Sequence, residues 1–130
     1  MTEHPASPPM RVAVARLDSA EKVSFGPLAY YQKLIGSDGG PIFTGVQTCA
    51  PGYQTRPHFH PYTECLFIIE GSMEAWLVGD ETALQTLQAG DMISLPAEAP
   101  HAFRNPGPGT LRLLGIHNNP TRIVHYLDQV

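Results

Sequence analysis

The sequence predicts an all-β fold, either a sandwich or a barrel, and two observations carry this prediction. Thirteen prolines and twelve glycines are spread along 130 residues, and such frequent breakers leave little room for long helices. The stretches between them are short and rich in Val, Ile, Thr, Phe and Tyr, the composition typical of strands. Short strands at regular spacing, separated by turn residues, are typical of β-sandwiches and barrels.

Nine segments are expected to form strands, and a turn at 79–81 is expected to join two of them as a hairpin. In chain order, the expected strands are residues 11–17, 28–34, 42–49, 63–69, 73–78, 84–87, 91–95, 101–104 and 111–117.

One helix is expected near the end, at residues 120–127. Pro120 suits a first helical turn, and Ile123, Val124 and Leu127 recur at helical spacing. The β-branched and aromatic residues in the same stretch would equally suit a strand, so both interpretations stay open here.

The length fits one domain, and 42% apolar residues indicate a globular chain. We expect residues 1–10, rich in proline and polar residues, to be a flexible tail, with the barrel domain at 11–130. No segment approaches the ~20 apolar residues of a membrane helix, and the first residues lack the apolar region of a signal peptide. We therefore expect a cytoplasmic protein.

A net charge of −4 and scattered basic residues give no electrostatic case for nucleic acid or an anionic membrane as partner. Cys49 and Cys65 form no C-x-x-C pair, which excludes a zinc ribbon, and we expect both to be reduced.

Chemistry-bearing residues gather in two places. His58 and His60, two apart on an extended segment, point to the same side and can bind one metal ion together. After a turn, Glu64 can return to that side, and His101 is the obvious fourth ligand from elsewhere. Three imidazoles and a carboxylate suit one divalent transition metal, without choosing among Fe, Mn, Ni, Zn and Cu, and leave positions open for water, dioxygen or a chelating substrate.

The first of these places resembles the cupin superfamily. That family's first motif is G-x5-H-x-H-x3,4-E-x6-G, and residues 52–71 match it at every position. The matching residues are Gly52, His58, His60, Glu64 and Gly71.

The second place, residues 90–105, resembles the second cupin motif, G-x5-P-x-G-x2-H-x3-N. Gly90, Pro96, His101 and Asn105 match, but Glu98 stands where the family has a glycine. A glycine there indicates a positive φ or a tight turn, so Glu98 must accept that backbone or shift it. We expect a solvent-facing loop residue with a relaxed turn, and the alternative is a carboxylate at the barrel mouth near the metal.

The resemblance implies a single cupin domain, a double-stranded β-helix (jelly-roll) barrel with the metal held inside by His58, His60, Glu64 and His101. It does not imply one reaction. Cupins include dioxygenases, sugar-phosphate isomerases, oxalate enzymes, polyketide cyclases, storage proteins and sensor domains.

Strand alternation predicts which residues line the pocket above the metal. Leu66 and Ile68 share the parity of Glu64, Phe103 shares that of His101, and Leu113 and His117 come from the last strand. This predicts a mostly apolar pocket. With only Arg56 and Arg104 near the motifs, a sugar-phosphate substrate is disfavoured.

We therefore expect a metal-dependent enzyme, a dioxygenase or a cyclase/isomerase, acting on a small aromatic or polyketide-like molecule that chelates the ion. Glu64 is a candidate general base. The alternative from another class is a non-catalytic small-molecule binding or sensor cupin.

Residues 65–69 and most of 111–116 are apolar on both strand faces. Because one face of a barrel strand usually meets water, the second face needs another cover. A second copy of the chain is the expected cover, which predicts a homodimer.

Overall fold

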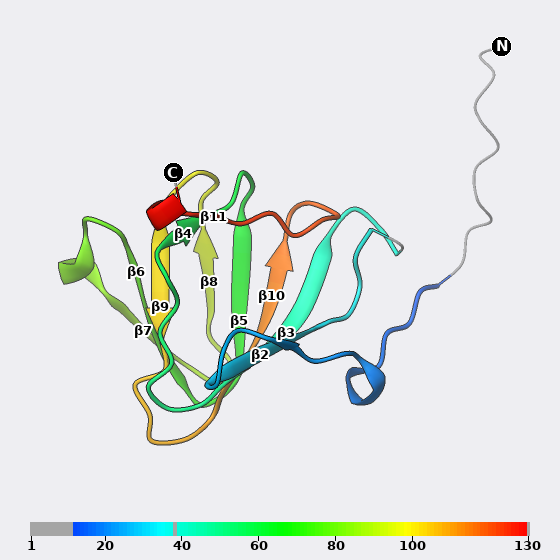
Figure 1. Ribbon diagram of the computed structural model, residues 1–130, viewed down its shortest axis with the longest axis horizontal. Helices are drawn as coiled ribbons and strands as arrows, with labels where there is room; N and C mark the ends of the chain where they lie inside the picture. The colour runs from blue at the N-terminus through cyan, green and yellow to red at the C-terminus, as the bar shows by residue number, and fades with distance from the viewer. Residues whose placement is uncertain (1–11, 38, 130) are drawn as a thin grey trace, which may run out of the picture.

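The computed structural model describes residues 12–37 and 39–129, and it confirms the all-β prediction. The described residues form short antiparallel strands and single-turn 3-10 helices (Figure 1). The strands are β1 Val23–Ser24, β2 Ala29–Lys33, β3 Phe43–Cys49, β4 His58–Phe59, β5 Glu64–Glu70, β6 Ser72–Leu77, β7 Gln85–Gln88, β8 Met92–Leu95, β9 His101–Arg104, β10 Leu111–His117 and β11 His125–Tyr126. The 3-10 turns are η1 Leu17–Ser19, η2 Glu81–Ala83 and η3 Leu127–Gln129.

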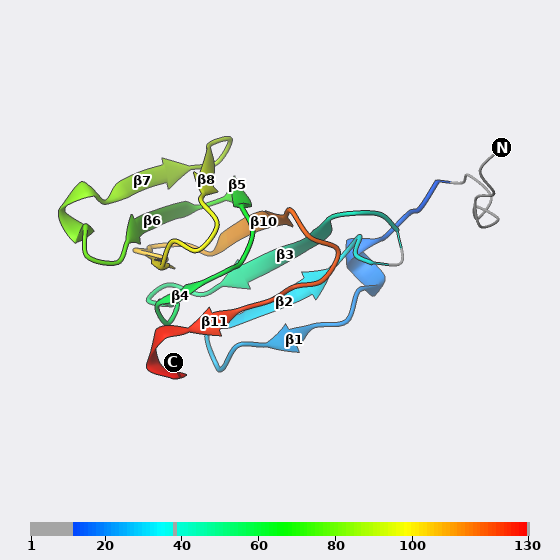
Figure 2. The same cartoon turned by 90° about the horizontal axis from the view of Figure 1, so that it is seen from above.

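Two antiparallel sheets make up the fold, as in a jelly-roll barrel (Figure 2). The first has the strand order β1-β2-β3-β10-β5-β8, and the second has the order β11-β4-β9-β6-β7. Strands distant in sequence are neighbours: β10 lies between β3 and β5, and β9 lies between β4 and β6. This arrangement brings the two motif segments onto one barrel end.

The inner faces of the two sheets form the hydrophobic core. Burial alternates strictly along β10, with Leu111 and Leu113 facing inward and Arg112 outward, as the sequence predicts. Ile68 from β5 and Met73 from β6 meet them with no exposed surface. This alternation fixes the register, because a slip by one residue would turn every inward side chain to water.

Gly71 joins β5 to β6 at a φ of +83°, a conformation that favours glycine. A Cβ atom at this position would collide with the backbone carbonyl of Thr110. The last glycine of the first motif is thus required both by its backbone angle and by the close approach of the chain.

Two predicted elements are wrong. Residues 12–16 of the expected strand 11–17 pair with nothing, and Leu17 begins η1, while Arg11 lies outside the described residues. Val12 and Val14 are 89% and 69% exposed, so the alternating apolar residues of this segment do not pack against the barrel.

The expected helix at 120–127 is also absent. His125 and Tyr126 form β11 instead, paired with Phe59 and His58 of β4. We call residues 118–129 the closing segment. It runs from the end of β10 across the top of the molecule to β4, drawn in orange-red to red in Figure 1. Backbone N–H and C=O groups of β4 are available for pairing, and this pairing outweighs the weak helical spacing of apolar residues in the segment.

The cysteines are free thiols, as predicted, with Cys49 buried. No helix within residues 12–37 and 39–129 is long and apolar enough to cross a membrane. Ile69 and Met92, on β5 and β8, are about half exposed. The homodimer, the cytoplasmic location and the tail at 1–10 stay predictions, the tail lying outside the described residues.

Candidate metal centre and adjoining pocket

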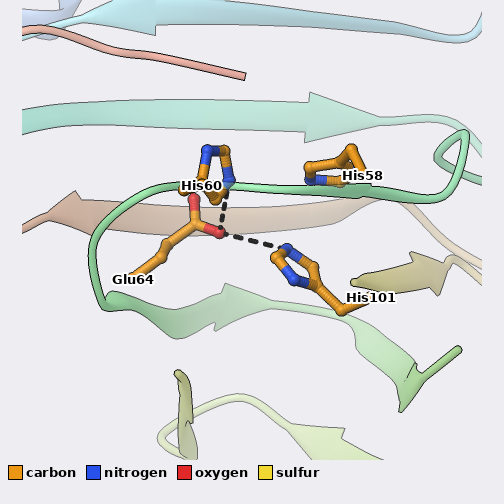
Figure 3. Close-up of side chains that lie close together, drawn as sticks. All are labelled: His58, His60, Glu64 and His101. Carbon is orange, nitrogen blue, oxygen red and sulfur yellow. Dashed lines mark ion pairs between the residues drawn. The ribbon is translucent and has the colours of Figure 1, made fainter. Parts of the chain in front are cut away.

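The structure brings the four predicted ligands together at one end of the barrel. His58 lies on β4 directly opposite His101 of β9, and Glu64 begins β5 after the bend that follows His60. One potential ligand atom from each residue lies within 4.8 Å of the others. All four are at least 92% buried, and their side chains converge in Figure 3. The cluster therefore has the residue types and the spacing that fit one metal ion.

Each of these histidines is oriented by a hydrogen bond from its Nδ1 to a backbone carbonyl. The acceptors are Arg56 for His58 at 2.7 Å, Ala99 for His101 at 2.9 Å and Ile123 for His60 at 2.6 Å. Because a carbonyl can only accept, each Nδ1 carries the proton and each Nε2 presents a lone pair. Such outer hydrogen bonds fix the ring orientation of metal-binding histidines.

The Nε2 atoms of His60 and His101 are buried and make no hydrogen bond, and no other buried side-chain nitrogen or oxygen in the described part of the chain shares this state. They lie 3.2 and 3.6 Å from Oε1 of Glu64, the contacts dashed in Figure 3. Three electron-rich atoms facing one another are unfavourable alone, and a cation between them would reverse that. The residues present thus fit a divalent metal.

The other carboxylate oxygen of Glu64 is held separately. His117 Nε2 lies 2.9 Å from Oε2, and His117 Nδ1 lies 2.6 Å from the hydroxyl of Tyr62. Burial alone would raise the pKa of Glu64, but the hydrogen bond that His117 Nε2 donates to Oε2 holds it well below its usual range. Glu64 is therefore ionised and offers Oε1 to the cluster, while His117 and Tyr62 brace Oε2.

Burial, together with the nearby His101, lowers the pKa of His58 to about 4. The ring is consequently neutral at physiological pH. A neutral imidazole is the form that binds a metal, so His58 needs no proton loss to do so.

A cavity of about 340 Å³ opens above the cluster. The structure places the predicted Leu66, Phe103, Leu113 and His117 in its lining. Ile68, predicted with them, lies one step further along β5 in the hydrophobic core and does not line the cavity. Alternation gives the correct face, but it does not say how deep the pocket reaches.

The pocket is more polar than the sequence predicts. Besides the apolar wall it is lined by several further polar and charged side chains, namely Tyr31, Gln47, Tyr53, Gln54, Thr55, Arg56, Arg122 and Tyr126. Sequence reasoning missed Arg122 and Tyr126 because it left residues 120–127 open between a helix and a strand and so could not place their side chains. The one signal in the sequence was the open strand interpretation of that stretch.

Glu98 takes the backbone expected of the family glycine, with a φ of +67°. Its side chain is exposed and does not line the cavity, and its N–H donates to the carbonyl of His60 at 2.8 Å. The solvent-facing interpretation is confirmed, and the alternative of a carboxylate at the barrel mouth near the metal is wrong. The turn is kept rather than relaxed, so Glu98 carries the strain that glycine would avoid.

Residues 45–117 match the Cupin domain family, more than half of the chain, so this protein belongs to the cupin family. The resemblance of the two motifs is thereby confirmed. The match includes both motifs and ends before the closing segment.

The proteins to which this chain is similar carry names of several different activities. The polyketide synthase CurC of Streptomyces cyaneus is 31% identical over 66% of this chain and 53% of its own length. The polyketide cyclase RemF of Streptomyces resistomycificus matches with a TM-score of 0.73 and 23% identity, over 91% of this chain and 85% of its own. Oxalate decarboxylase of Lactobacillus farciminis matches with a TM-score of 0.74 and 22% identity, over 87% of this chain and 35% of its own. This chain thus spans about half the length of CurC, and the structural likenesses show the fold alone.

Proposed function

We propose that this protein is a metal-dependent cupin enzyme that closes rings in a small polyketide-like substrate. The observation that carries the proposal is that the Nε2 atoms of His60 and His101, buried and without a hydrogen bond, converge on Glu64 Oε1 below a small-molecule cavity. His58 completes the proposed ligand set. The sequence similarity to the polyketide synthase CurC favours a polyketide-like substrate, and the shared fold of the polyketide cyclase RemF can accommodate ring closure.

A bound divalent ion would supply Lewis acidity to the oxygens of a chelating substrate. In the reaction class proposed, a methylene between two carbonyls loses a proton, its carbon bonds to another carbonyl carbon, and water leaves. No oxidant or reductant is consumed. Atoms and electrons therefore balance within the substrate itself.

The residues of this chain would orient the substrate and exclude water from it. Leu66, Leu113 and Phe103 form an apolar wall that favours a flat, hydrophobic substrate and displaces water from it. Glu64 is held ionised, as a metal ligand should be. Because its pKa lies well below the usual range, however, its carboxylate is a weak base near pH 7. Its role as proton acceptor stays a prediction.

The test measures proton abstraction and oxygen use in one sample. Protein loaded in turn with Fe, Mn, Ni, Zn or Cu is mixed with ethyl benzoylacetate in D2O, and methylene exchange is followed by NMR beside an oxygen electrode. We expect accelerated exchange without oxygen uptake, lost in His101→Ala. Oxygen uptake would favour the dioxygenase alternative. Thermal stabilisation by the ester with neither exchange nor uptake would favour a non-catalytic binding protein.

A further inference from the structure

The cavity holds a guanidinium that the metal cluster does not use. Arg122, half-buried in the closing segment, lines the cavity together with Phe25 and Tyr31. Its guanidinium lies 5.2 Å from the ring centre of Phe25 and 5.1 Å from that of Tyr31, and these two rings stack with centroids 5.0 Å apart. Aromatic faces at this distance hold an arginine side chain in place while leaving its N–H groups free to donate.

The charge of Arg122 is not matched by a carboxylate. Within the described ranges, no acidic side chain forms an ion pair with it. The other arginine of the lining, Arg56, differs in this respect, because its Nε and Nη2 atoms donate to the carboxylate of Asp128, at 3.2 and 2.6 Å. Glu64, the single carboxylate of the lining, is occupied by the histidines. Arg122 is thus the unpaired cation of the cavity.

The backbone next to Arg122 is fixed on the metal side. The carbonyl of Ile123 accepts from His60 Nδ1, and the Ile123 N–H donates to the Tyr62 hydroxyl at 3.0 Å. The positive charge of Arg122 also acts on another residue of the pocket. Burial raises the pKa of Tyr53 to about 12, and Arg122 is the nearby cation that opposes this rise. An arginine anchored this closely belongs to the same binding site as the cluster.

We propose that Arg122 forms an anion subsite, and that the natural ligand is a flat aromatic or conjugated molecule carrying a carboxylate that Arg122 binds. The planar guanidinium matches a carboxylate with two parallel hydrogen bonds. The apolar wall of Leu66, Leu113 and Phe103 receives the flat part of the ligand. A cavity of about 340 Å³ suits a molecule of one or two rings. This inference deepens the proposed function. It rests on that function's assignment of the cavity as the substrate site, but it does not depend on a bound metal.

The experiment separates the arginine from the metal by using metal-free protein. Binding of naphthalene-2-carboxylate and of its neutral carboxamide is measured by calorimetry at pH 7.5. We expect the carboxylate to bind at least about 10-fold tighter, since hydrogen bonds to charged groups are among the strong ones. Arg122→Met should abolish this preference, and Arg122→Lys should keep part of it.

Arg112→Met is the matched control, because Arg112 lies on the outer face of β10, bonded to Thr48, and does not line the cavity. It should leave the preference intact. Equal binding of the two probes by the wild type, or a preference that survives in Arg122→Met with folding unchanged by circular dichroism, would overturn the subsite. Failure of metal binding with an intact preference would instead remove the proposed function alone.

Discussion

The two motif segments and the closing segment contribute to the same site in different ways. In the motif segments, His58 and His101 are each oriented by the carbonyl of the residue two positions earlier in the chain, just before their strand begins. His60 is oriented by Ile123, which lies 63 residues later in the sequence. Two of the three rings are thus set locally, and the third depends on a segment outside both motifs.

This difference teaches that a complete cupin motif is not a complete site. The motif residues alone specify which atoms converge. The closing segment specifies the remaining ring orientation and adds Arg122, the cation without a carboxylate partner among the described residues that line the pocket. The following predictions test how far that division holds, beginning with the motif side.

The largest effect is expected from removing a ligand in a motif strand. His101→Ala should weaken metal binding about 1,000-fold, roughly 4 kcal/mol, beyond the 10–100-fold typical of outer residues. Competition titration against a chromogenic chelator measures this. A loss no greater than the one expected below for Tyr62→Phe, which loosens the closing segment, would contradict the division.

Acid should act next, also on the motif side. Burial, with the help of His101, lowers the pKa of His58 to about 4, against about 6.5 when unfolded. Between these values the unfolded chain binds the additional proton, so stability falls as pH drops from 6.5 to 4, by up to about 3 kcal/mol. Denaturant unfolding of metal-free protein at several pH values checks this.

Asp128→Asn is the control for the acid prediction. Asp128 is exposed and paired only with Arg56 at the surface, so its removal should leave the pH profile unchanged. A profile that flattens in this variant, or one that shows no slope above pH 4 in the wild type, would count against His58 as the titrating group.

A smaller effect is expected from loosening the closing segment. Tyr62→Phe removes the hydroxyl that receives the Ile123 N–H and meets Nδ1 of His117. We expect metal affinity to fall about 10-fold, as for outer residues elsewhere, and stability to fall by about 1–2 kcal/mol because a partly buried N–H loses its partner. An unchanged metal affinity would mean that the segment does not support the site.

The smallest effect concerns the one local departure within the motifs. Glu98→Gly should raise stability by about 0.5–1 kcal/mol, because glycine relieves the left-handed conformation and loses part of that gain in chain entropy. Thermal unfolding measures it. Glu98→Ala keeps the strain, so it should not share the gain.

The sequence allowed much of the barrel and the ligand cluster to be predicted, because both follow from local periodicity and spacing. The burial of Leu113 and His117 on β10 and the meeting of His58 with His101 are of this kind. The polar side of the pocket was not predictable in the same way. Tyr126 becomes a strand residue only because β4 offers it a ladder, and that pairing joins residues far apart in the chain.

The bond between His60 and Ile123 has a thermodynamic consequence. A movement of the closing segment would also release the His60 ring that it orients. Ligand binding in the pocket and metal binding at the cluster are therefore linked, and such a linkage is reciprocal. A ligand that draws Arg122 and its neighbours inward would tighten the hold on the ion, and the ion would tighten the hold on that ligand to the same degree. Residues 118–129 would then couple the binding of a ligand in the pocket to the binding of an ion by the cluster beneath it.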